Sequence, residues 1–126
     1  MKKILALCGI IVLIEVGYLV WRVSKPEHYG RAFAGAPPIE LRELASNPDK
    51  YTNVEVTVSG KIVRQCPSAG CWFYLEDANK SQVRVEMDGV ISTLPRRVGH
   101  KATAEGRLAK VGDEYKLFGE GVQFSK

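Results

Sequence analysis

The sequence predicts a mainly β protein, in which a small five-stranded barrel follows a short helix and is tethered to one N-terminal transmembrane helix. Three observations support this prediction. An apolar run of 18 residues lies near the N-terminus, five short stretches with strand character follow it, and a glycine interrupts the longest of them. Of the 126 residues, 45% are hydrophobic and 25% are charged, which is the composition of a globular protein.

The apolar run Ile4–Trp21 reaches the lower limit of length for a helix that spans a bilayer. Eleven Ile, Leu or Val residues, each contributing about 0.3–0.6 kcal/mol, outweigh the cost of about 3 kcal/mol for the one acid, Glu15. We therefore expect residues 1–23 to form the anchor. Glu15 either stays protonated in a single helix or contacts a partner helix.

Basic residues flank the apolar run on both sides. Lys2, Lys3 and the amino terminus outweigh Arg22 and Lys25, which Glu27 partly offsets. By the positive-inside rule this favours a cytoplasmic N-terminus. The expected location is the inner (cytoplasmic) membrane, crossed once, with the soluble domain on the periplasmic or extracytoplasmic side.

Two kinds of processing would change this location. Cleavage by a signal peptidase requires small residues soon after the apolar core, and the nearest such pattern begins at Ala32. Lipidation of Cys8 requires a small residue where Leu7 stands, and the apolar run continues past the cysteine. An uncleaved anchor is therefore the favoured interpretation.

The net charge of +4 is concentrated around the anchor. From Pro26 onward, 14 Lys or Arg face 13 Asp or Glu, which leaves a net charge of about +1. A soluble domain with so little excess charge lacks the electrostatic support for binding phosphodiester backbones. We expect a membrane and a membrane protein as partners, and no nucleic acid.

The composition from residue 24 to residue 37 is rich in Pro, Gly and Ala and has no period, which predicts a linker. The domain is expected to occupy residues 38–126. It begins with a short amphipathic helix, because Leu41, Leu44 and Ala45 have helical spacing between Pro38 and Asn47-Pro48.

Five strands are expected after this helix. The first runs from Val54 through Gly60, where we expect a bend or bulge, to Cys66. The others run from 71 to 76, from 83 to 87, around 102 to 108, and from 115 to 124. Five short strands with one long, bent first strand fit an OB-like barrel better than a sandwich of about seven strands.

The stretch from Pro38 to Leu108 resembles an uncharacterised family of exported bacterial OB-like domains. The resemblance rests on the V-x-V-x-V-x-G-x-I pattern, on the C-x-x-x-G-C-W pattern ending at Trp72, and on G-x-x-x-x-x-E-G from Gly99 to Gly106. It implies the barrel and export. A looser likeness to the membrane-anchored haem chaperone of cytochrome c maturation lacks that family's haem-attaching histidine, so no cofactor is expected.

Cys66 and Cys71 bracket a four-residue loop between the first two expected strands, where opposed side chains approach disulfide distance. In an exported protein this arrangement favours a disulfide. A thiolate site for copper or zinc is the alternative, although zinc generally requires four ligands and only His28 and His100 are available besides. Thiol redox catalysis would favour the two-residue C-x-x-C spacing.

Strand alternation directs Trp72 and Tyr74 outward and Phe73 into the core. Such a pair could stack on nucleic-acid bases, but a covered or partner-facing pair is favoured because basic residues near it are few. No Ser/His/Asp set, paired carboxylate site or phosphate loop can be assembled, so we expect no enzyme. The sequence thus predicts a non-catalytic binding or accessory module that contacts its partner through Trp72, Tyr74 and Glu15. The alternatives are a metal carrier using Cys66 and Cys71, and an exported binder of nucleic acid or oligosaccharide.

Overall fold

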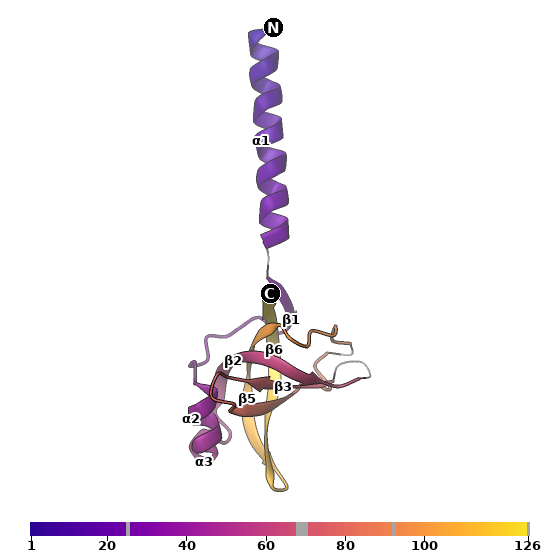
Figure 1. The fold of residues 1–126 in the computed structure, drawn as a ribbon. Helices are drawn as coiled ribbons and strands as arrows, with labels where there is room; N and C mark the ends of the chain where they lie inside the picture. The colour runs from indigo at the N-terminus through magenta and orange to yellow at the C-terminus, as the bar shows by residue number, and fades with distance from the viewer. Residues whose placement is uncertain (25, 68–70, 92, 126) are drawn as a thin grey trace.

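The computed structural model describes residues 1–24, 26–67, 71–91 and 93–125. The long helix α1 (Lys2–Ser24) stands away from a small β-barrel (Figure 1). The remaining elements are β1 (Glu27–Gly30), α2 (Leu41–Ser46), α3 (Pro48–Tyr51), β2 (Glu55–Gln65), β3 (Trp72–Glu76), β4 (Gln82–Glu86), β5 (Lys101–Val111) and β6 (Glu114–Ser125).

The sheet closes on itself through β5. Strands β2, β3 and β4 form an antiparallel meander, β4 pairs in parallel with β6, and β5 pairs antiparallel with both β6 and β2. Five strands in this order make the Greek-key barrel of the OB type. The predicted mainly β, OB-like fold with an apolar N-terminal helix is confirmed.

The barrel core comes from the alternating apolar positions of its strands, and α2 adds two leucines. Its largest fully buried apolar side chains are Phe73, Ile62, Leu75, Met87, Leu108 and Leu117. Gly60 is required where β2 meets α2, because a Cβ there would lie 2.9 Å from the carbonyl oxygen of Glu76 and 3.0 Å from Cδ1 of Leu41. The bulge itself falls slightly later, between Ile62 and Arg64.

Helix α1 is exposed along Lys2–Val23 and is long and apolar enough to cross a membrane. A signal sequence near an N-terminus has the same properties. Helix α1 ends at Ser24 and β1 begins at Glu27, so only a short stretch of chain separates the apolar helix from the sheet.

The segment 24–37 is not a linker throughout, as the sequence had predicted, because residues 27–30 form β1 and pair antiparallel with β6. Glu27 accepts two hydrogen bonds from the guanidinium of Arg97, at 2.9 and 3.0 Å. The four residues of β1 show no strand alternation. Their structure depends on an edge of β6 and on an arginine 70 positions away in the chain.

The buried carboxylate of Glu105 holds the residues that follow β1 on the barrel. Glu105 is 1% exposed and accepts hydrogen bonds from the backbone N–H groups of Ala34 (2.8 Å) and Ala36 (3.1 Å). The guanidinium of Arg31 donates to the same carboxylate at 3.1 Å. Thr57 adds a bond from its hydroxyl to the carbonyl of Ala36 at 2.9 Å. Residues 31–37 therefore lie against the outside of the barrel and cover Glu105.

We predict that Glu105→Ala lowers the free energy of unfolding by about 1.5–3 kcal/mol, because the backbone N–H groups of Ala34 and Ala36 lose a charged acceptor. Glu55→Gln is the matched control. Glu55 pairs with the same arginine at 3.3 Å, but this pair is solvent-accessible and its loss should cost less than about 1 kcal/mol. Urea denaturation of both variants measures the difference, and equal losses would contradict the role of Glu105.

The carboxylate of Glu105 also makes the stability of the fold depend on pH. Burial raises the pKa of Glu105, but the N–H groups of Ala34 and Ala36 and the Arg31 guanidinium outweigh burial and hold that pKa below its ordinary value of 4.5. A lowered pKa means that the stabilisation is complete above pH 4.5 and is lost as the pH falls through the folded-state pKa. Glu105→Gln should flatten this acid limb of the stability profile.

Candidate functional site

The outer face of β3 and β4 carries an aromatic pair. Trp72 and Tyr74 are half-buried and point outward, whereas Phe73 between them is fully buried, as alternation predicts. Their ring centroids lie 5.8 Å apart in an edge-to-face arrangement with an interplanar angle of 88°. Such a geometry is favoured for aromatic pairs and fixes both rings.

Two arginines cover this pair from the neighbouring strands. Cζ of Arg64 on β2 lies 4.5 Å from the centroid of Tyr74, and Cζ of Arg84 on β4 lies 4.7 Å from the centroid of Trp72. Each guanidinium also lies within 6.0 Å of the second ring. These distances are in the range of cation–π attraction. Two cations and two rings thus form one ordered surface cluster.

Polar contacts hold the edge of the cluster toward β6. Nε of Arg84 donates to Glu86 at 2.6 Å, and Lys116 forms an ion pair with the same carboxylate at 3.7 Å. The hydroxyl of Tyr74 donates to Glu114 at 3.3 Å. Phe118 lies beside Glu86 in the strand register and is 42% exposed. We call the set Arg64, Trp72, Tyr74, Arg84 and Phe118 the aromatic–arginine surface.

The sequence identified Trp72 and Tyr74 but missed Arg64 and Phe118. Strict alternation from Val56, Val58 and Ile62 places position 64 inside the barrel. The bulge between Ile62 and Arg64 instead places this arginine opposite Tyr74 on the outside. A bulge shifts the inside–outside pattern by one residue, and alternation alone cannot reveal it.

Cys66 and Cys71 are the first and last residues of the loop between β2 and β3, and positions 68–70 of this loop lie outside the described residues. Sγ of Cys71 donates a hydrogen bond to Sγ of Cys66 at 2.8 Å. The structure therefore brings the two thiols together, as the sequence predicted. A disulfide requires a sulfur–sulfur distance of about 2.05 Å, a small displacement from this position.

The hydrogen bond to Cys66, followed by burial, raises the pKa of the Cys71 thiol above its ordinary value of 9.0. A raised pKa keeps this sulfur protonated at neutral pH and makes it a poor nucleophile. Metal binding must in addition displace that proton. Within the described ranges, no group of three or more His, Cys, Asp or Glu side chains could hold a metal ion.

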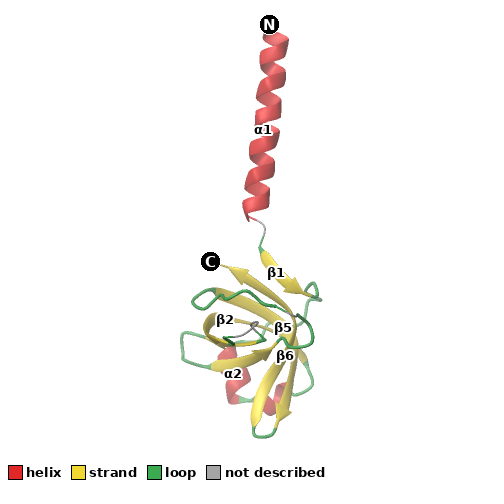
Figure 2. Cartoon of the chain, turned by 90° about the vertical axis from the view of Figure 1, so that its right-hand side faces the viewer, coloured by secondary structure: helices red, strands yellow, loops and turns green. Residues whose placement is uncertain are grey.

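The third proposed contact residue lies elsewhere. Glu15 is in the middle of α1, which stands apart from the barrel, so the structure does not bring it to the aromatic–arginine surface (Figure 2). His28 lies on β1, where its ring contacts the carbonyl oxygen of Arg31 at 2.8 Å. Cys66 and Cys71 belong to the loop between β2 and β3.

The chain matches no protein-family model and no curated protein sequence. Among solved structures it is similar to a putative aspartyl-tRNA synthetase from Leishmania major Friedlin, with a TM-score of 0.54, 15% identity, and coverage of 87% of this chain and 26% of that one. It is also similar to the hypothetical protein ygiW from E. coli, with a TM-score of 0.48, 16% identity, and coverage of 74% and 100%. Telomere capping protein Ten1 from S. pombe has a TM-score of 0.48, 14% identity, and coverage of 67% and 77%. At these identities the likeness concerns the fold alone.

The thiol pair gives a prediction that separates a crosslink from a metal site. Protein isolated from an oxidising compartment without reductant should have one reactive thiol, Cys8, and no stoichiometric copper or zinc. Replacing both Cys66 and Cys71 with serine should lower the free energy of unfolding by about 2 kcal/mol, because a short closed loop is released. Cys8→Ser is the control and should leave stability unchanged. Thiol titration of the unfolded protein with elemental analysis gives the measurement; two further titratable thiols with one equivalent of copper would contradict the crosslink.

Proposed function

We propose that this chain is a non-catalytic, membrane-anchored binding or accessory module whose OB-like barrel docks on a membrane protein on the extracytoplasmic side. The apolar helix α1 supports the anchor by its length and composition. The excess of positive charge at Lys2 and Lys3 supports a cytoplasmic N-terminus. The adjacent thiols of Cys66 and Cys71 favour an oxidising compartment.

The aromatic–arginine surface carries the proposal. Trp, Tyr and Arg are the residues most enriched among those that dominate binding energy at protein interfaces. Here they are held in place before any partner arrives, by stacking and by the contacts of Arg84 and Tyr74 with Glu86 and Glu114. Preorganised side chains lose little conformational entropy on binding, so more of the contact energy appears as affinity.

The same geometry disfavours base stacking. A nucleic-acid base requires an open aromatic face, and guanidinium groups of the chain itself lie over the rings of Trp72 and Tyr74. Two of the nearby positive charges, on Arg84 and Lys116, are directed at Glu86. We therefore favour protein docking over the binding of single-stranded nucleic acid as the function of this surface.

A thiolate metal carrier is the second candidate, and the close approach of the two cysteine sulfurs is the observation that favours it. Soft thiolates select Cu(I). The raised pKa of Cys71 opposes this reading, since the thiol must lose its proton to bind a metal.

A photoreactive residue at position 74 should crosslink in intact membranes to one discrete membrane protein, whereas the same residue at the exposed hairpin position Val111 should not. Trp72→Ala should then weaken affinity for that partner by about 30-fold or more, the effect of losing a dominant interface residue. Val111→Ala is the matched control and should bind normally. Thermal unfolding confirms that each variant is folded. Equal crosslinking from positions 74 and 111 would contradict the docking role of the aromatic–arginine surface.

Glu15 gives a separate prediction for the anchor. Glu15→Leu should leave membrane insertion intact or improved, because the central acid is removed, but it should weaken association with the partner. Glu15→Gln is the control, since it retains a hydrogen-bonding group and should preserve most of the association. Extraction at high salt followed by copurification measures both properties. Unchanged copurification of the leucine variant would show that Glu15 contributes nothing.

A further inference from the structure

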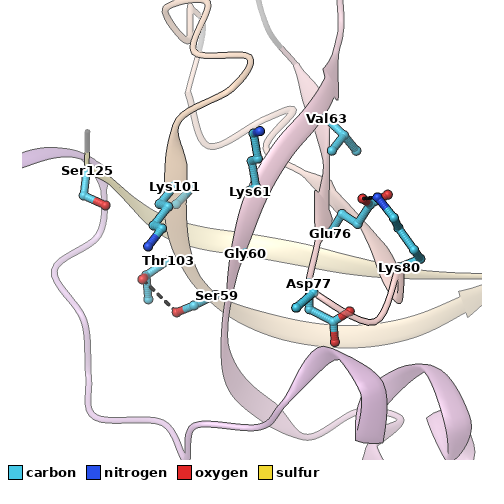
Figure 3. Close-up of a pocket in the computed structure, with 12 residues that line it drawn as sticks. Ser59, Gly60, Lys61, Val63, Glu76, Asp77, Lys80, Lys101, Thr103 and Ser125 are labelled. Atoms are coloured by element: carbon cyan, nitrogen blue, oxygen red, sulfur yellow. Dashed lines mark hydrogen bonds and ion pairs between the residues drawn. The ribbon is translucent and has the colours of Figure 1, made fainter.

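An open groove of about 720 Å³ lies over the outer faces of β2, β3 and β5 (Figure 3). On β2 and β3 it adjoins the aromatic–arginine surface, because Lys61 pairs with Glu76 and Arg64 pairs with Tyr74. Two lysines, Lys61 on β2 and Lys101 on β5, stand along it. The hydroxyls of Ser59 and Thr103, which are hydrogen-bonded to each other at 2.8 Å, lie beside them. Ser125 at the end of β6 completes this side of the groove.

The strand register places the two lysines directly opposite each other. Lys61 pairs with Lys101 across β2 and β5, and the next outward pair along these strands is Ser59 with Thr103. Like charges on directly opposed residues destabilise a sheet. The two ammonium groups point in different directions in Figure 3, as repulsion would favour. An anion bound between the two lysines would reduce this repulsion.

Two acids line the groove, and the contacts of both are with other residues. Glu76 pairs with Lys61 in the register of β2 and β3, but its carboxylate forms an ion pair with Lys80 at 3.3 Å and accepts a hydrogen bond from Gln82. The carboxylate of Asp77 accepts hydrogen bonds from the backbone N–H groups of Asn79 and Ser81. Across the residues that the structure describes, neither Lys61 nor Lys101 forms an ion pair. Two adjacent cations and several hydroxyl donors are thus open to an external anion.

The position of the groove relative to α1 indicates where that anion comes from. Lys101 pairs with Ser125, and the preceding residue of β6, Phe124, pairs with Glu27 at the start of β1. Helix α1 ends at Ser24, three residues before Glu27. The C-terminal end of β6 lies beside the junction between α1 and the barrel in both views (Figures 1 and 2). The lysine pair therefore begins one strand away from the point where the chain leaves the apolar helix.

We propose that Lys61 and Lys101 bind the phosphate headgroup of an anionic lipid in the bilayer that α1 spans. Ammonium groups bind phosphates as point charges. Ser59 and Thr103 share one hydrogen bond, so one of their two hydroxyls, together with that of Ser125, can donate to the remaining oxygens. The attraction of a lysine to an anionic leaflet acts within a Debye length of the surface, and the register places Lys101 one strand away from the residues that follow α1. The proposal rests on the membrane anchoring proposed above. Its consequence is that the headgroup orients the barrel on the membrane and fixes which face a partner meets.

The test measures the reactivity of individual lysines in the full chain. The protein is reconstituted into nanodiscs of phosphatidylcholine alone or of phosphatidylcholine with phosphatidylglycerol, and a water-soluble amine reagent labels it before analysis by mass spectrometry. Labelling of Lys61 and Lys101 should slow by about five-fold in the discs that contain phosphatidylglycerol. Lys50 and Lys110 lie on α3 and near the hairpin tip, and they serve as internal references with unchanged rates.

Two variants sharpen the test. Lys61→Gln should remove most of the protection of Lys101, since one headgroup engages both lysines, and it should slightly raise the unfolding temperature in phosphatidylcholine discs by removing the repulsion. Lys110→Gln makes the same change in net charge and should alter neither the protection of Lys101 nor the unfolding temperature. About 1 M salt should abolish the protection.

Each outcome decides the inference. Protection that requires phosphatidylglycerol supports it. Equal labelling in both kinds of disc, with the chain still coeluting with the discs, overturns the lipid site and leaves the anchor intact. Equal protection by inorganic phosphate in phosphatidylcholine discs overturns the membrane as the source of the anion. A chain that does not coelute with the discs overturns the anchor and the lipid site together.

Discussion

Closure of the barrel by β5 is the constraint on which the other features depend. This strand pairs with β2 on one side and β6 on the other, so a six-stranded sheet becomes a barrel with few open edges. Closure buries one face of every barrel strand and turns the other outward. It therefore assembles both surface sites: the aromatic–arginine surface on β2, β3, β4 and β6, and the lysine groove on β2 and β5.

The closed barrel also explains how the long apolar helix can be followed so soon by a folded domain. Two sets of contacts hold residues 26–37 on the barrel. Strand β1 pairs with β6, and the carboxylate of Glu105 accepts hydrogen bonds from the backbone of Ala34 and Ala36. Buried charge is costly unless hydrogen bonds satisfy it, and three donors, from Arg31, Ala34 and Ala36, converge on the carboxylate of Glu105. The chain between α1 and the barrel is consequently short, which limits the distance between the barrel and whatever surrounds the helix.

The two surface sites have different chemistry. The rings of Trp72 and Tyr74 with their arginines form a rigid, partly apolar patch, whereas Lys61 and Lys101 are a solvent-exposed pair of cations on opposed strand positions. A rigid patch of aromatic and arginine side chains is typical of protein interfaces, whereas a pair of ammonium groups suits an anion. The two sites are neighbours on the outer faces of β2 and β3.

The sequence by itself determined the fold class, the apolar helix, the strand positions, the approach of Cys66 to Cys71, and the outward direction of Trp72 and Tyr74. Each of these follows from local periodicity or from short spacing along the chain. The tertiary structure alone decided that residues 27–30 form a strand, that Glu105 is buried, and that Arg64 lies over Tyr74. Strand β1 depends on a distant edge of β6, Glu105 on donors about 70 positions earlier, and Arg64 on a bulge that shifts the alternation of β2. Such contacts arise only when closure brings remote segments together, and no local pattern records them.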